Sequence, residues 1–169
     1  PKLPPKTGGL IFPDLPGAVQ EAEQVELMLD SHGFDVTSRI NERAREIMIG
    51  LHDDGYRVLH LAAHGVHELV IEVDGGSDQT CGSCDQTLPK RKKTVSGMVI
   101  GDGVYLTPGD IEQMRWVPEL VFINCCHLGN TVSADPEWTR YSALAANMAS
   151  QFINMGVRVV VAAGWAVDD

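Results

Sequence analysis

The chain has 169 residues, of which 23 are acidic and 13 basic, so its formal net charge is −10 at pH 7. This length, with 44% hydrophobic residues, predicts one globular domain whose core needs no disulfide or structural metal. The negative charge disfavours nucleic acid and anionic membranes as partners, and without a signal-peptide pattern or a membrane-spanning apolar run we expect a cytoplasmic protein.

The N-terminal third predicts an arm followed by two helices. Residues 1–9 contain three prolines, two lysines and two glycines, which is typical of a linker or arm, and the domain is expected over 10–169. Apolar residues spaced three and four apart predict an amphipathic helix over Gly17–Ser31. A short strand is expected at Phe34–Ser38, and Asn41 is expected to cap a second helix over Glu42–His52.

Three nearly continuous apolar runs predict buried parallel strands. They cover Tyr56–Ala63, Leu120–Asn124 and Val157–Ala163, and a helix over about 140–155 precedes the third. Because strands and helices alternate, the expected class is α/β with a mostly parallel sheet.

The region between the first two buried strands has a different pattern. Alternating residues in Leu69–Val73 and Met98–Leu106, with a turn at Gly101–Gly103, predict a small antiparallel hairpin insertion. Residues at about 74–96 are rich in Gly, Ser and Asp and predict a mobile loop.

Reactive side chains follow two of the predicted strands. His64 comes directly after the first, and Cys125 and Cys126 come directly after the second. The carboxyl ends of parallel strands meet at one edge of a sheet, so an imidazole and a thiol would face each other there, as nucleophilic acyl transfer requires. The amides of Gly65 and Cys126 are candidates for an oxyanion hole.

Each candidate also has a structural interpretation. A cysteine at the end of a buried strand is more often a small core residue than a nucleophile, and this is what we expect of Cys125. His60 is expected to be a satisfied sheet-face histidine, and His64 alone would favour a structural role. The order of a strand-end His-Gly and then a strand-end Cys, with Gly129 three residues after Cys126, favours the functional interpretation.

Four segments in this order resemble the CHAT domain, a caspase-like relative of separase that often lies beside tetratricopeptide repeats. They are His-Leu-Ala-Ala-His-Gly at 60–65 and the segments 96–107, 120–129 and 159–169. The resemblance implies a caspase-like three-layer sandwich with parallel-type strands near residues 10, 34, 57, 119 and 157. A sixth strand would follow Asp169, so the domain is expected to be truncated at its C-terminal end.

The resemblance also assigns roles to residues. It implies that His64 is the catalytic histidine and that Cys126 rather than Cys125 is the nucleophile. Trp165 and Asp169 would form an S1 pocket that selects Arg or Lys. The competing interpretation of Asp169 is a solvated strand end.

The expected function is therefore a cysteine endopeptidase that cleaves a protein substrate after basic residues, needs no cofactor, and is regulated by a partner protein or a tetratricopeptide-repeat region. One alternative is a catalytically inactive scaffold or interaction module with the same fold. Another is a small-molecule hydrolase or acyltransferase on a doubly wound sheet.

Two further motifs carry weaker hypotheses. Cys81 and Cys84 have the spacing of half a zinc site, with His67 as a third candidate ligand, but zinc needs four ligands. The basic run Lys90–Lys93 is a candidate for autoprocessing or self-inhibition, against the simpler interpretation of a charged surface loop.

Overall fold

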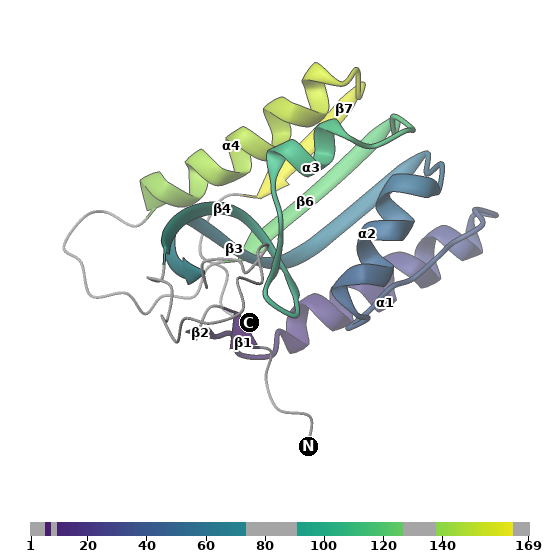
Figure 1. Ribbon diagram of the computed structural model, residues 1–169. Coiled ribbons are helices and arrows are strands. Elements are labelled where there is room, and N and C mark those ends of the chain that lie inside the picture. Colours follow the sequence, from purple (N-terminus) through teal and green to yellow (C-terminus); the bar gives the residue numbers. More distant parts are fainter. Residues whose placement is uncertain (1–5, 8–9, 74–90, 127–137, 164–169) are drawn as a thin grey trace, which may run out of the picture.

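The computed structural model describes residues 6–7, 10–73, 91–126 and 138–163 (Figure 1). The helices are α1 Pro16–Ser31, α2 Ala44–Asp53, α3 Pro108–Glu112 and α4 Trp138–Asn154. The strands are β1 Lys6–Thr7, β2 Leu10–Ile11, β3 Val58–Val73, β4 Arg91–Gly101, β5 Val104–Leu106, β6 Leu120–Cys126 and β7 Val159–Ala163.

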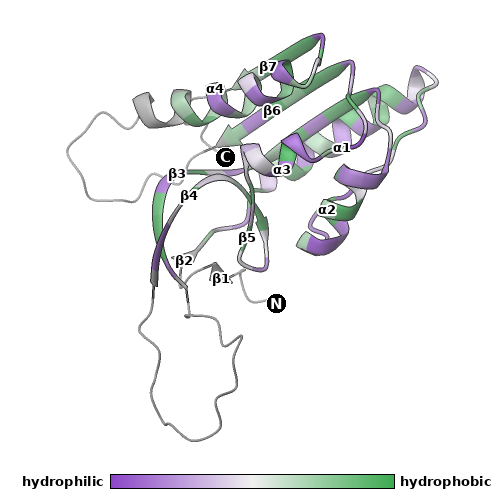
Figure 2. Cartoon of the chain, turned by 45° about the horizontal axis from the view of Figure 1, so that its top comes forward, coloured by the Kyte–Doolittle hydropathy of each residue, from purple (hydrophilic) through white to green (hydrophobic). Residues whose placement is uncertain are grey.

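Five of the strands form one sheet in the order β5-β4-β3-β6-β7. Strands β3, β6 and β7 are parallel, whereas β4 and β5 are antiparallel additions beyond β3. The predicted α/β class is confirmed, with the three apolar runs as its parallel strands and the hairpin insertion at one edge. Figure 2 shows β6 and β7 as largely hydrophobic, as strands covered by a helix should be.

Two of the five parallel-type strands expected from the resemblance are absent from the main sheet in the part of the chain that the structure describes. Leu10–Ile11 pairs with β1 in a separate two-stranded hairpin. Phe34–Ser38 is not a strand, because the amide of Phe34 bonds the Leu29 carbonyl at the end of α1 and its ring stays 41% exposed. This bond uses the amide of Phe34 at the end of the helix, so that amide cannot also donate in a ladder.

The sheet separates two helical layers. Helices α2, α3 and α4 cover one face and share a core with the sheet, whereas α1 lies on the opposite side of the strands (Figure 1). The central side chains of that core are fully buried: Met98, Ile111, Val121, Ile123, Leu144, Met148 and Phe152. The layers therefore match a three-layer sandwich, with its large apolar core on the α4 side.

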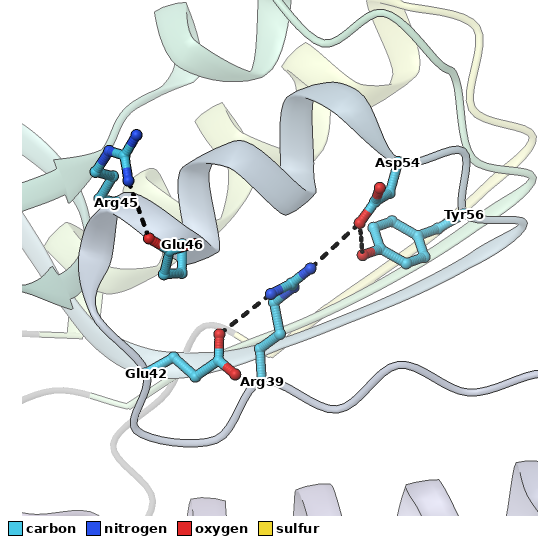
Figure 3. Close-up of polar contacts among 6 residues, drawn as sticks. All are labelled: Arg39, Glu42, Arg45, Glu46, Asp54 and Tyr56. Atoms are coloured by element: carbon cyan, nitrogen blue, oxygen red, sulfur yellow. Dashed lines mark hydrogen bonds and ion pairs between the residues drawn. The ribbon is translucent and has the colours of Figure 1, made fainter.

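The segment between α1 and α2 is fixed by Arg39. Its guanidinium bonds Glu42 at 3.2 Å and Asp54 at 3.3 Å, and the Tyr56 hydroxyl donates to the same Asp54 at 2.8 Å (Figure 3). The expected cap at Asn41 is wrong. Asn41 has a left-handed backbone with φ of 53°, which turns the chain, and α2 begins only at Ala44.

The first parallel strand is longer than predicted. It continues through His64 into the hairpin insertion and changes partner there, pairing with β6 up to His64 and with β4 from Gly65 onward. Strand β4 begins at Arg91, so residues 91–96 belong to a strand and not to the expected loop. The predicted turn is present, with positive φ at Asp102 and Gly103 as a two-residue hairpin turn requires.

Candidate active site

The structure brings the two reactive positions to the same level of the sheet. His64 ends the part of β3 that pairs with β6, and its register partner across the parallel ladder is Cys126, the last residue of β6. Neighbouring parallel strands lie about 4.8 Å apart. The histidine and cysteine positions are therefore adjacent at the carboxyl ends of two strands, while the side chain of Cys126 lies outside the described residues.

His64 is held in one orientation by its surroundings. Its side chain is buried, with 7% exposed, and its Nε2 donates to the carbonyl oxygen of Pro13 at 2.7 Å. The ring of Phe12 lies 5.6 Å from the imidazole, centroid to centroid. A carbonyl can only accept a hydrogen bond, so this contact places a proton on Nε2 of the imidazole.

The opposite face of the same strand ends is closely packed. A Cβ atom added to Gly65 would lie 2.7 Å from Cδ2 of Leu144 on α4 and 3.3 Å from Cβ of Cys125. Cys125 is 4% exposed within the core, as predicted for a structural cysteine. Residue 65 must therefore be small for α4 to approach the strands this closely.

A second polar cluster lies below His64 on the α1 side of the sheet. The carboxylate of Glu21 on α1 accepts a hydrogen bond from His60 Nε2 and another from Asn124 Nδ2, each at 2.7 Å. The His60 ring also stacks on Phe122, with centroids 5.4 Å apart. His60 is thus the satisfied sheet-face histidine that its position in the sequence indicates.

A groove of about 1430 Å³ opens beside these groups. It runs between α1, residues 33–43 and the edge of β3, and His64, Phe12 and Pro13 lie among its walls. Val58–His64 pair with β6 on one edge, and no strand among the described residues pairs with the other.

Several predicted site residues lie outside the described part of the chain. They are Trp165 and Asp169 of the expected S1 pocket, and Cys81 and Cys84 of the candidate zinc site. Among the described residues no group of three or more His, Cys, Asp or Glu side chains could hold a metal ion, and no helix there is long and apolar enough to cross a membrane. The basic run is partly described, and Arg91–Lys93 pair with Ile71–Val73 in the ladder.

Sequence reasoning missed two contributors to this site. Pro13 acts through its carbonyl, a group that every residue carries, so no residue type could have indicated it. Glu21 was one of several acidic residues on the polar side of a predicted helix. A glutamate within an amphipathic helix does not by itself predict a contact with the sheet. It becomes a usable signal only together with the polar residues His60 and Asn124, which stand inside apolar strands and need hydrogen-bond partners.

Comparison with known protein families gives a match. The family model described as the CHAT domain matches residues 4–169, which is nearly the whole chain. No curated protein and no solved structure matches the chain.

Proposed function

Since this chain belongs to the CHAT domain family, a caspase-like and peptidase-related family, we propose that it is a cysteine endopeptidase with Cys126 as nucleophile and His64 as its acid–base partner. The observation that carries the proposal is the register of β3 and β6, which pairs these two positions at the carboxyl ends of adjacent parallel strands. The bond from His64 to the Pro13 carbonyl adds to it, because it orients the imidazole.

Acylation starts from the Cys126 thiolate, which an adjacent imidazolium stabilises. The sulfur attacks the scissile carbonyl carbon and forms a carbon–sulfur bond while the carbonyl electron pair moves to oxygen. The amides of Gly65 and Cys126 then stabilise that oxyanion. The carbon–nitrogen bond breaks as Nδ1 of His64 gives its proton to the leaving amine, and a thioester remains.

Deacylation runs through the same two groups. His64, now neutral, takes a proton from a water molecule whose oxygen attacks the thioester carbonyl. The carbon–sulfur bond breaks, the new carboxylic acid leaves, and the thiolate–imidazolium pair is restored. Because Nε2 is bonded to Pro13, one imidazole nitrogen carries all the proton transfers.

Substrate choice is proposed to rest on Trp165 and Asp169 at the end of the chain. A carboxylate at the bottom of a pocket walled by an aromatic ring selects an Arg or Lys side chain through a charge-assisted hydrogen bond. The overall charge of −10 supports this choice, because it attracts basic segments of a protein substrate. A partner or a tetratricopeptide-repeat region is proposed to regulate the activity.

Active-site labelling tests the proposal. A peptidyl acyloxymethyl ketone with Arg at the position that precedes the scissile bond should alkylate the full-length natural protein in the presence of its regulatory partner. Cys126→Ala should abolish the labelling, because the nucleophile is removed. Cys125→Ala is the matched control, since it changes the neighbouring thiol in the core and should leave labelling intact.

A non-catalytic interaction module is the competing function. The burial of His64 beneath Phe12 favours it, because a closed histidine suits a domain that binds without cleaving. The two functions give opposite results in the same experiment. Labelling that survives Cys126→Ala, or no labelling of the natural protein with its partner, would reject the peptidase and leave the module.

A further inference from the structure

The cluster of Glu21, His60 and Asn124 has no part in the chemistry described so far, although it lies directly below the reactive positions. We propose that Glu21 is a positioning residue. Its carboxylate clamps α1 to both β3 and β6, and it thereby holds the Pro13 carbonyl where it orients His64 beside Cys126. The effect on rate rests on the proposed function, whereas the effect on His64 does not.

The geometry of the clamp links two strands through one side chain. One carboxylate oxygen accepts from His60 on β3 and the other accepts from Asn124 on β6, both at 2.7 Å. His60 lies four residues before His64, and Asn124 lies two residues before Cys126 on the neighbouring strand. Any slip between the two strands would break one of these bonds, so the carboxylate favours the register that pairs the reactive positions.

The clamp also determines where α1 lies. Helix α1 has no buried residue, so apolar packing alone leaves its position on the sheet weakly determined. Hydrogen bonds to an ionised carboxylate are about twice as strong as neutral ones and are sensitive to geometry. Pro13 lies three residues before Pro16, the first residue of α1, so a shift of the helix moves the carbonyl that holds His64.

Replacing the carboxylate of Glu21 by an amide changes its hydrogen bonding while the shape of the side chain stays the same. Glu21→Gln keeps the size of the side chain but replaces one acceptor oxygen by an NH₂ donor, so both bonds persist only if His60 takes its other tautomer or Asn124 turns its amide, and both bonds lose the charge of the carboxylate. The clamp is weakened, and we expect the rate constant of alkylation to fall about 10- to 100-fold, as for a small misplacement of a reacting group. Asn124→Asp should also slow the reaction, because it places two carboxylates together.

The double variant Glu21→Gln with Asn124→Asp should recover most of the lost rate. The new amide nitrogen donates to the new carboxylate while the amide oxygen still accepts from His60. A residue that acted only through its charge near the thiol would give opposite effects in the two single variants, whereas the clamp predicts that both react more slowly. The matched control is Glu23→Gln on the same helix, an exposed glutamate, which should leave the rate unchanged.

A readout independent of activity is the nuclear magnetic resonance signal of the His64 Nε2 proton, assigned by its loss in His64→Ala. This proton is bonded to the Pro13 carbonyl, so it should give a low-field signal in the natural protein. In Glu21→Gln the signal should move upfield or be lost to exchange with water, and the double variant should restore it.

The outcomes separate the two proposals. If the natural protein is labelled and Glu21→Gln reacts as fast as Glu23→Gln, the positioning role is rejected and the peptidase stands. If nothing is labelled, the peptidase is rejected and the His64 signal decides the clamp. A signal that is the same in the natural protein and in Glu21→Gln rejects the clamp, and a signal that changes supports it.

Discussion

Gly65 shows how one missing side chain allows the site to form. It lies between His64 and the hairpin insertion, at the point where β3 changes partner from β6 to β4. The absence of a Cβ atom there lets α4 approach the strand ends, with Leu144 filling the space that a side chain would need. The face of the strand ends opposite His64 is therefore closely packed against α4, and this packing supports the backbone of the histidine.

Gly65→Ala should destabilise the protein by about 1–3 kcal/mol, because the added methyl group would lie 2.7 Å from Cδ2 of Leu144. Urea denaturation measures this change. Gly109→Ala is the matched control, since its nearest neighbour would be the Thr107 hydroxyl at 3.7 Å within a helix, and it should be neutral or slightly stabilising. Equal free energies of unfolding for the two variants would contradict the close approach of α4.

At the scale of secondary-structure elements, the two faces of the sheet differ in how completely they are covered. On β6, Val121 faces the α4 core and is fully buried, whereas Val159 and Val161 on β7 are 48% and 45% exposed. Val161 is the register partner of Phe122, on the side of the sheet where α1 lies mainly over β3. The α4 side of the sheet thus supplies most of the stability, and the α1 side carries the polar groups.

Two valine-to-threonine substitutions test this difference. Val121→Thr should lower the free energy of unfolding by about 1–3 kcal/mol, because it buries a hydroxyl in an apolar core. Val161→Thr makes the same substitution on the less covered face and should change the free energy of unfolding by less than about 0.5 kcal/mol. Chemical denaturation of both variants gives the comparison, and equal losses would show that the α1 face is covered as well.

Helices and strands were predictable from the sequence where the burial of apolar residues alone decides which element forms. The apolar runs at 56–63, 120–124 and 157–163 contain the parallel strands, because each run buries at least one face in the core on the α4 side. Phe34–Ser38 and Leu10–Ile11 could not be placed, because a short segment is a strand only if a neighbour pairs with it. Helix α3 had a readable signal, since Thr107 and Asp110 form a capping box around Pro108.

The adjacency of the two candidate residues was predictable from the sequence, whereas the contacts that hold His64 and α1 were not. His64 and Cys126 could be found because reactive residues that follow buried strands meet at one sheet edge, and their register agrees with that expectation. The bonds from Pro13 and Glu21 join segments far apart in the chain. Such bonds depend on how α1 lies on the sheet, which no local pattern determines.

At the scale of the whole molecule, we expect the stability to depend on pH through the cluster of Arg39, Asp54 and Tyr56. Burial, and then the hydrogen bond to Asp54, raise the pKa of Tyr56 above its ordinary value of 10.0. A group whose pKa is raised in the folded state stabilises it fully below pH 10, and this contribution is lost as the pH rises through the folded-state pKa. The connection between α1 and β3 should therefore loosen in alkali.

Tyr56→Phe should be less stable than the natural protein at pH 8, by about 1 kcal/mol, because Asp54 loses a hydrogen bond. Above pH 10 its stability should fall less steeply, since one titrating group is gone. Urea denaturation between pH 8 and pH 11.5 measures both effects. Identical slopes for the two proteins would contradict the raised pKa of Tyr56.

The bonds around His64 also have a consequence for biosynthesis. Pro13 and His64 are 51 residues apart, and Glu21 and Asn124 are 103 residues apart. A chain that leaves the ribosome from its N-terminus can complete the histidine contact early, but Glu21 can join both strands only after β6 has emerged and docked. On the proposed function, a nascent chain therefore has its histidine in place long before its cysteine, and it gains the ability to cleave a peptide only once β6 has joined the sheet.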